Sequence, residues 1–163
     1  MSDFYTEQLI KKQPNGKDTL KKAALISLAI VSVLVVFIFP LGLLIPIVVI
    51  ALVYFLLTRL DVEYEYLFVN GDLDIDKIMH KSRRKHVFSA NAKEMELLAP
   101  EGHPRLDGYR NAKVVDFSSG VRSDRRYVLV TGEKGVMTKL IFEPNDTIIE
   151  GMFLMAPRKV VRR

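Results

Sequence analysis

Five cations and two histidines lie between positions 77 and 86 of this sequence, and no acidic residue separates them. Clusters of four to eight Lys or Arg beside a membrane anchor attract anionic lipid headgroups by about 1 kcal/mol each. The run therefore predicts contact with anionic lipid or with a partner molecule. The alternative is a solvated hairpin end whose charges pair with nearby acids. The cations are Lys77, Lys81, Arg83, Arg84 and Lys85, and the histidines are His80 and His86.

Alternating acids precede this basic run. Asp72, Asp74 and Asp76 would project from one side of a strand. The spacing imitates the beginning of a calcium-binding loop, but such a loop has Gly at its sixth position and Glu at its twelfth. This chain has Lys77 and Arg83 there, so the pattern does not predict a calcium site.

An acidic face of this kind needs a cation nearby. A two-residue turn after the preceding strand would place Glu65 opposite Asp76, and like charges directly opposite each other destabilise a sheet. Arg84 or Lys85 on the next strand could supply the positive charge. We therefore expect a solvated or ion-paired acidic face.

The residue types that usually carry catalysis do not occur in catalytic spacing. The histidines are not paired at helical spacing with a carboxylate, and Ser118-Ser119-Gly120 lacks the G-x-S-x-G frame of a nucleophile elbow. The sequence has no cysteine, which excludes a thiol nucleophile, a disulfide and a Cys-ligated metal. We expect no catalytic residues, no cofactor and no metal, so the protein is not expected to be an enzyme.

The element that must position these residues is a long apolar stretch from Ala23 to Thr58, which contains no Lys, Arg, Asp, Glu or His. As one helix it would far exceed the roughly 30 Å hydrocarbon core of a bilayer. Pro40 and Gly42 divide it, which predicts a transmembrane hairpin over 18–58 with spans at about 23–39 and 41–58. A re-entrant wedge is the alternative that the prolines allow.

Basic residues flank the apolar stretch on both open ends and are absent from its central loop. Lys21 and Lys22 precede it, and Arg59 follows it. Because Lys and Arg near membrane ends are retained inside the cell, we expect a multi-pass protein of the cell (inner or plasma) membrane with both termini cytoplasmic. A cleaved signal peptide is not expected, since the charged region is long and no small-x-small cleavage pattern follows.

The N-terminal segment, 1–17, carries four apolar residues at a spacing that puts them on one side of a short helix. This helix could lie on the membrane surface, and a frayed terminus is the alternative. Asp18 is expected to cap the helix that enters the bilayer. The four apolar residues are Phe4, Tyr5, Leu9 and Ile10.

After Arg59 the hydrophobic period changes from helical to alternating, which predicts strands. The first strand ends at Asn70-Gly71, a strong signal for a two-residue hairpin turn. A short helical turn is expected near 106–110. We predict seven strands, at 62–69, 73–79, 85–90, 93–98, 113–118, 126–131 and 136–143.

A helix follows Pro144, and either Asn145 or Thr147 caps it. Its apolar stripe would cover an open end of the strands. We predict that two apolar faces form one core, Tyr64, Tyr66, Phe68, Leu73 and Ile75 from the strands with Ile148, Met152 and Phe153 from the helix. The basic tail, 158–163, is expected to be mobile.

Four strands, three more strands and a capping helix follow the order of the pleckstrin-homology-like (PH-like) fold. The chain resembles the bacterial version of that fold over about 61–157, and it also resembles a family of small, uncharacterised two-span bacterial membrane proteins. The resemblance implies a seven-stranded antiparallel β-roll or barrel with a C-terminal helix, after a membrane hairpin. The residues that carry it are Tyr64-Glu65-Tyr66, Asn70-Gly71, Arg83-Arg84-Lys85 and the segment from Phe142 to Asp146.

These observations lead to three functional hypotheses. The first is a membrane-anchored PH-like binding module, over 59–157, that meets a protein partner at the cytoplasmic face. The second is binding of an anionic lipid surface through 77–86, and the third is an accessory subunit of a membrane complex. Nucleic acid is not an expected partner, because the soluble part is only mildly basic and the hairpin holds it at a membrane.

Overall fold

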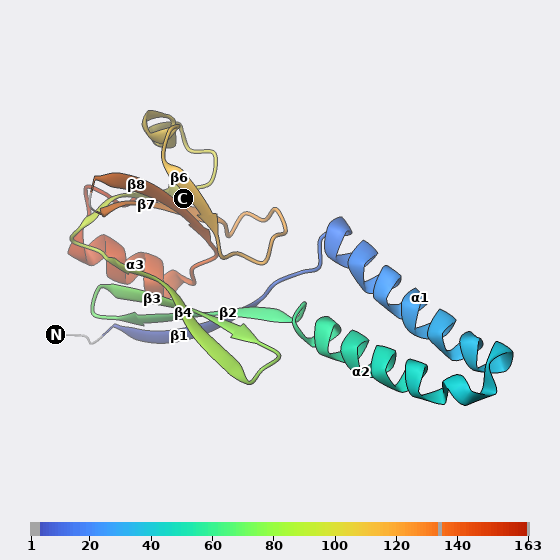
Figure 1. Cartoon of the computed structure of the whole chain (residues 1–163). Helices are drawn as coiled ribbons and strands as arrows, with labels where there is room; N and C mark the ends of the chain where they lie inside the picture. The colour runs from blue at the N-terminus through green and yellow to red at the C-terminus, as the bar shows by residue number, and fades with distance from the viewer. Residues whose placement is uncertain (1–3, 134, 163) are drawn as a thin grey trace. The chain divides into compact units, whose positions relative to one another are not determined.

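The computed structural model describes residues 4–133 and 135–162 (Figure 1). The chain divides into two compact units. The helical unit comprises Pro14–Val62 and Met79–Arg83. The β unit comprises the described residues up to Gln13, Glu63–Ile78 and the chain from Arg84 onward.

Two helices form the larger part of the helical unit. Helix α1 covers Gly16–Ile38 and helix α2 covers Leu44–Thr58, with the 3₁₀ turn η1 at Pro40–Leu43 between them. The break occurs where the sequence predicted it, because Pro40 cannot donate the backbone hydrogen bond that would continue α1. Figure 1 shows α1 and α2 side by side.

Only α1, among the described helices, is long and apolar enough to cross a bilayer by length and composition. Its most apolar window has a mean hydropathy of 2.2 and is 6% buried, so its side chains lack a protein environment. Helix α2 is also apolar but has 15 residues, which is shorter than a typical span. The paired helices therefore match the predicted hairpin in shape, while their insertion as two spans stays a prediction.

The start of α1 differs from the prediction. The side chain of Asn15, and not that of Asp18, caps the helix, since Asn15 Oδ1 accepts a hydrogen bond from the Asp18 backbone N–H at 2.8 Å. Asp18 lies in the first turn, where its negative charge favours the positive end of the helix dipole. The helix consequently begins several residues before the apolar stretch.

The first sheet of the β unit has the strand order β1-β2-β3-β4. The predicted hairpin at Asn70-Gly71 is confirmed, because both residues have the positive φ of a type I′ turn, 47° and 101°. Alternation along β2 places Tyr64, Tyr66 and Phe68 in the core. The strands cover Tyr5–Lys11 (β1), Val62–Val69 (β2), Asp72–Met79 (β3) and Arg83–Asn91 (β4).

Strand β1 corrects the prediction of a surface helix or frayed terminus at the N-terminus. It pairs antiparallel with β2, from Tyr5 opposite Val69 to Lys11 opposite Glu63. The Thr6 and Gln8 side chains reach Asn145 at the beginning of the C-terminal helix, through Thr6 Oγ1 at 3.0 Å and Gln8 Oε1 at 2.8 Å. These polar contacts, which apolar periodicity does not register, fix the segment as a strand.

The second sheet has the order β5-β7-β8-β6, in which β6 and β8 run parallel. The 3₁₀ helix η2, Pro104–Tyr109, lies close to the helical turn predicted near 106–110. Within the described residues the chain has eight strands in two sheets, so the prediction of seven was wrong, because it omitted β1. The prediction of a wholly antiparallel arrangement was also wrong, because β6 pairs parallel with β8. The strands of this sheet are Met95–Pro100 (β5), Lys113–Asp116 (β6), Tyr127–Glu133 (β7) and Val136–Phe142 (β8).

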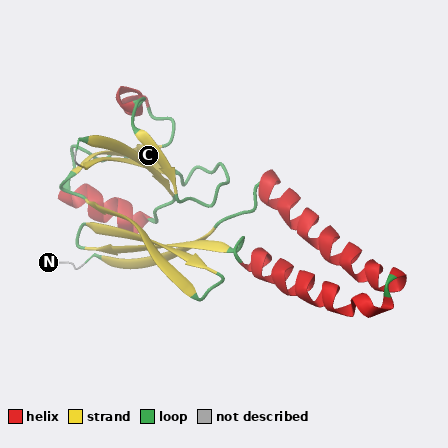
Figure 2. Ribbon diagram, in the orientation of Figure 1, coloured by secondary structure: helices red, strands yellow, loops and turns green. Residues whose placement is uncertain are grey.

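Helix α3, Asp146–Met155, begins after Asn145, whose side chain accepts a hydrogen bond from the Ile148 backbone N–H at 3.0 Å. This identifies Asn145 as the cap instead of Thr147. Figure 2 shows α3 between the two sheets. Its buried residues are Ile148, Gly151 and Met152.

The predicted core is correct except for Phe153. Seven of the eight predicted side chains are buried, but Phe153 is half-buried and the Arg162 guanidinium carbon lies 3.4 Å from its ring centroid. The inward positions of α3 are instead taken by Ile148, Gly151 and Met152. The tail is also ordered where it is described, since Leu98 of β5 hydrogen-bonds with Lys159 and Val161 at 2.8 and 2.7 Å.

Candidate functional site

Strand geometry separates the five cations that the sequence placed in one run. Lys77 lies on β3, Lys81 in the β3–β4 turn, and Arg83, Arg84 and Lys85 on β4. Successive side chains of a strand point to opposite faces, so Arg84 cannot share a face with Arg83 and Lys85. The cations are therefore distributed over at least two surfaces.

Arg84 belongs to the acidic face. Its guanidinium forms an ion pair with Glu65 at 2.9 Å, which confirms the prediction that a cation from this strand neutralises Glu65. His86 Nδ1 lies 3.0 Å from Asp76 Oδ1, and Asn91 donates a hydrogen bond to Asp72 at 2.6 Å. The acidic face is thus ion-paired and hydrogen-bonded across β3 and β4, and no group of three or more potential metal ligands occurs among the described residues.

The other cations behave differently. Among the described residues, no acidic side chain lies within ion-pair distance of Lys81, Arg83 or Arg59. Lys81 and Arg83 are also exposed to solvent. Their charge is consequently available to a ligand.

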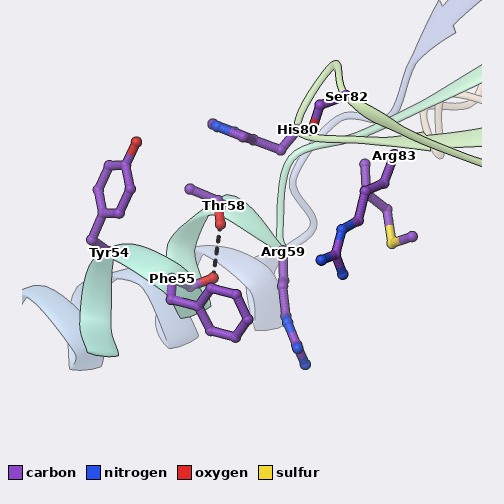
Figure 3. A pocket seen from close by; sticks show the side chains of 8 residues that line it. Tyr54, Phe55, Thr58, Arg59, His80, Ser82 and Arg83 are labelled. Carbon is purple, nitrogen blue, oxygen red and sulfur yellow. Dashed lines mark hydrogen bonds between the residues drawn. The ribbon is translucent and has the colours of Figure 1, made fainter. Parts of the chain in front are cut away.

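Arg59 and Arg83 line the same pocket of the helical unit, which has a volume of about 640 Å³. One wall is the last turn of α2, and the other is the β3–β4 turn (Figure 3). The Arg59 guanidinium carbon lies 4.4 Å from the centroid of the Phe55 ring, a cation–π contact. The lining consists of Tyr54, Phe55, Thr58, Arg59, Met79, His80, Ser82 and Arg83.

The walls of this pocket are held by backbone hydrogen bonds. The His80 N–H donates to the Asp61 carbonyl at 3.0 Å, which ties the β3–β4 turn to the residues that follow α2. The Thr58 hydroxyl donates to the Phe55 carbonyl at 2.8 Å, so its oxygen remains able to accept a hydrogen bond (Figure 3). The lining contains donors, an acceptor and aromatic rings, but no carboxylate.

The β3–β4 turn has an unusual backbone. His80 and Lys81 have φ values of 50° and 54°, in the left-handed region that favours glycine. The β2–β3 turn of the same sheet has the same left-handed backbone at Asn70 and Gly71. The β3–β4 turn thus has His and Lys where the backbone favours Asn and Gly.

A second polar cluster lies inside the β unit. The Tyr66 hydroxyl donates to the Phe117 carbonyl at 2.6 Å and accepts from the Glu143 N–H at 3.4 Å. Burial, and secondarily the nearby Glu143 and Asp116 charges, raise the pKa of Tyr66 above its usual range, although the Glu143 N–H opposes the shift. Glu143 accepts hydrogen bonds from the Ser119 and Ser123 hydroxyls at 2.9 and 3.2 Å.

Arg126 lies at the centre of another polar cluster in the β unit. Its buried guanidinium lies between two carboxylates, with Nη2 3.2 Å from Asp116 and Nε 2.9 Å from Glu101, although the Nε contact lacks hydrogen-bond geometry. Asp116 also accepts from the Ser118 N–H and hydroxyl at 2.9 and 2.6 Å. Both clusters fasten the loop from β6 to β7 to the sheets, so their side chains have structural partners.

Sequence reasoning missed the contribution of α2 to the pocket. Tyr54, Phe55 and Thr58 were read only as part of an apolar stretch, and Arg59 only as a topology signal. A tyrosine and an arginine near the end of a span are typical of the membrane–water interface, which could have indicated a site. The pairing of these residues with His80 and Arg83 depends on the position of the turn, which a single sequence does not give.

Two four-stranded sheets with a C-terminal helix between them define a PH-like domain. The chain belongs to the family described as "Bacterial PH-like domain (DUF6106)", whose model matches residues 2–162. The match includes the segments of β1, α1 and α2 as well as the β unit. Searches of curated proteins and of solved structures found no match.

Proposed function

We propose that the protein is a membrane-anchored PH-like binding module, in which α1 and α2 insert as a hairpin and the β unit lies at the cytoplasmic face. One observation carries this proposal. Strand β1 precedes the two helices, strand β2 follows them, and the two strands are paired neighbours in one sheet. Both ends of the helix pair must then emerge on the same side of a membrane.

This constraint distinguishes the ways in which the apolar helices could insert. If α1 crossed the bilayer alone, β1 and β2 would lie on opposite sides and could not pair. Removal of α1 as a signal sequence would also remove β1 from the sheet. Crossing by both helices, or a re-entrant hairpin, agrees with the pairing, and the lysines before α1 favour the cytoplasmic side.

The binding role rests on the chemistry of the β unit. Two of its acids, the buried Glu143 and the exposed Asp116, are held by serine and arginine side chains and form part of the fold. We therefore infer that the module acts by binding a protein partner and is not an enzyme. Anionic lipid is a second candidate partner, which Lys81, Arg83 and Arg59 favour because the described residues offer them no acidic partner.

Single cysteines in this cysteine-free chain test the topology. Asn15→Cys and Asn111→Cys should resist an impermeant maleimide in intact cells and react after the membrane is permeabilised, because both positions would be cytoplasmic. Leu43→Cys, between the helices, should react from outside in a two-span hairpin and from neither side in a re-entrant one. Labelling of Asn15→Cys or Asn111→Cys in intact cells would contradict the cytoplasmic orientation, and recovery of the chain in the soluble fraction would contradict anchoring.

A further inference from the structure

We propose that the pocket between the last turn of α2 and the β3–β4 turn binds the phosphate headgroup of an anionic phospholipid. We call it the headgroup pocket, and it consists of the eight lining residues given above. The inference rests on the proposed function, because a lipid can reach this pocket only if α2 inserts in the membrane. It adds a defined site and a ligand class to that function.

The charge of the pocket favours an anion. Arg59 and Arg83 approach it from two different elements, and Lys81 lies between two lining residues of the turn. The part of the chain that the structure describes offers these three cations no acidic partner. Guanidinium groups match the geometry of phosphate oxygens and bind them through paired hydrogen bonds.

Further hydrogen-bonding groups complete the polar side of the pocket. The His80 ring and the Ser82 hydroxyl lie on the turn, opposite Thr58 on α2 (Figure 3). These groups can hydrogen-bond to phosphate or to the hydroxyls of a headgroup such as glycerol. The volume of about 640 Å³ lies within the range of small-ligand sites.

The apolar side of the pocket favours a lipid over a free phosphate. Tyr54 and Phe55 belong to α2, and Met79 is the last residue of β3. Tyr54 is 65% exposed and lies on an otherwise apolar helix, where its ring would occupy the membrane–water interface. A lipid can place its phosphate among the cations and its glycerol and upper acyl chains against these side chains, whereas a free phosphate leaves them without a partner.

The backbone of the turn gives independent support. His80 and Lys81 occupy positions where Asn-Gly would fold with less strain, as the neighbouring turn at Asn70-Gly71 shows. Strained backbone persists where the surrounding structure or function requires the side chain. Binding at the headgroup pocket would require these side chains, because an Asn-Gly turn would remove the Lys81 cation and the His80 donor from its rim.

The experiment measures lipid binding by the full chain in zwitterionic detergent. Native mass spectrometry with added phosphatidylglycerol or phosphatidylcholine gives the apparent Kd for the first bound lipid. We expect phosphatidylglycerol to bind at least 10-fold more tightly than phosphatidylcholine. The double variant Arg59→Ser/Arg83→Ser should weaken phosphatidylglycerol binding by about 10- to 30-fold and leave phosphatidylcholine binding unchanged.

A charge-matched control separates this site from general attraction. Arg110→Ser/Lys113→Ser removes two exposed cations from the β unit, and Arg110 contributes only an exposed ion pair with Asp107 at 3.3 Å. The control should change phosphatidylglycerol binding by less than about 2-fold. The proposal would be overturned if the two double variants weakened phosphatidylglycerol binding equally, or if the pocket variant did not weaken it.

Two further measurements complete the test. Glycerol 1-phosphate at millimolar concentration should not displace phosphatidylglycerol, and displacement would identify a soluble phosphate ligand and overturn the lipid assignment. His80→Asn/Lys81→Gly should weaken phosphatidylglycerol binding about 3- to 10-fold while the melting temperature rises, which excludes misfolding as the cause. Cysteine labelling reports separately on the membrane hairpin, so loss of the headgroup pocket leaves the proposed function standing.

Discussion

Gly151 shows how a single residue determines the position of α3. A Cβ at this position would lie 2.4 Å from Phe68 Cε1 and 2.9 Å from Cζ, closer than carbon atoms approach in folded proteins. Phe68 is fully buried and cannot turn away. The absence of a side chain at Gly151 therefore allows the helix to approach the sheet.

The substitution Gly151→Ala tests this contact. Alanine is favoured over glycine in a helix by about 1 kcal/mol, but overpacking against a buried ring costs about 1 to 3 kcal/mol, so we expect net destabilisation of up to about 2 kcal/mol. Thermal or urea unfolding of the full chain in detergent measures it. Gly108→Ala is the matched control, since a Cβ there meets no atom within 4 Å, and an equal change in both variants would contradict the interpretation.

The raised pKa of Tyr66 predicts how the free energy of unfolding depends on pH. Burial raises the pKa of its hydroxyl well above the value near 10 of an exposed tyrosine, so the folded state keeps the proton at a pH where the unfolded state has lost it. The unfolded state then binds fewer protons, and the free energy of unfolding must fall as pH rises above about 10. Below about pH 10 the hydroxyl keeps its proton in both states, so Tyr66 makes its full contribution to the free energy of unfolding.

The variant Tyr66→Phe should cost about 1 to 3 kcal/mol at neutral pH, because the Phe117 carbonyl loses its hydrogen bond at 2.6 Å. The difference in the free energy of unfolding between this variant and the wild type should become smaller above about pH 10. A residual slope should remain in the variant, since burial also raises the pKa of Tyr64. Unfolding curves collected between pH 7 and 11 would contradict this assignment if the two proteins lost stability in parallel.

Side-chain periodicity predicted most of the core but misjudged single positions. Tyr64, Tyr66 and Phe68 alternate clearly, and every one is buried. Phe153 fits the helical stripe equally well, yet it is only half-buried, whereas Gly151 in the same helix lies against Phe68. Apolar patterns do not reveal that an absent side chain can define the packed face.

At the scale of the elements, the two turns of the first sheet differ in strain. Left-handed backbone costs roughly 1 to 2 kcal/mol for a residue with a Cβ, and less for Asn or His. Since His80 and Lys81 both adopt it, the double variant His80→Asn/Lys81→Gly should stabilise the protein by about 1 kcal/mol. Differential scanning measurements of wild type and variant give the result, and a lower melting temperature would show that these side chains hold the turn through contacts.

The first strands after Arg59 were predictable because β2 and the beginning of β3 bury one alternating face and are joined by the Asn70-Gly71 turn signal. Strand β1 was not, because its inward residues include Thr6 and Gln8, whose partners lie far along the chain at Asn145. The headgroup pocket was only partly predictable for a related reason. Lys81 and Arg83 belong to the basic run 77–86, but Arg59 lies outside it, and the separation of Arg83 from Arg84 depends on strand register.

At the scale of the whole molecule, the helix pair is an insertion between two neighbouring antiparallel strands. Lys11 and Glu63 are register partners, so the chain leaves the sheet at Lys11 and returns beside the same point. This connection explains how a segment before the apolar stretch can belong to the domain after it. The β unit should then fold without the helices when β1 and β2 are joined by a short loop.

We predict that replacing residues 14–61 by a short Gly-Asn-Gly-Ser linker gives a water-soluble, folded β unit. The linker needs to span only the distance between adjacent strands, and loop closure is less costly for a short connection than for a long one. Sedimentation and circular dichroism would test solubility and strand content. The matched control also lacks residues 1–12, and it should aggregate or melt at a lower temperature because β2 becomes an unpaired edge and Asn145 loses Thr6 and Gln8. Equal stability of the two shortened chains would mean that β1 is dispensable, and the argument that both ends of the hairpin share one side of the membrane would lose its support.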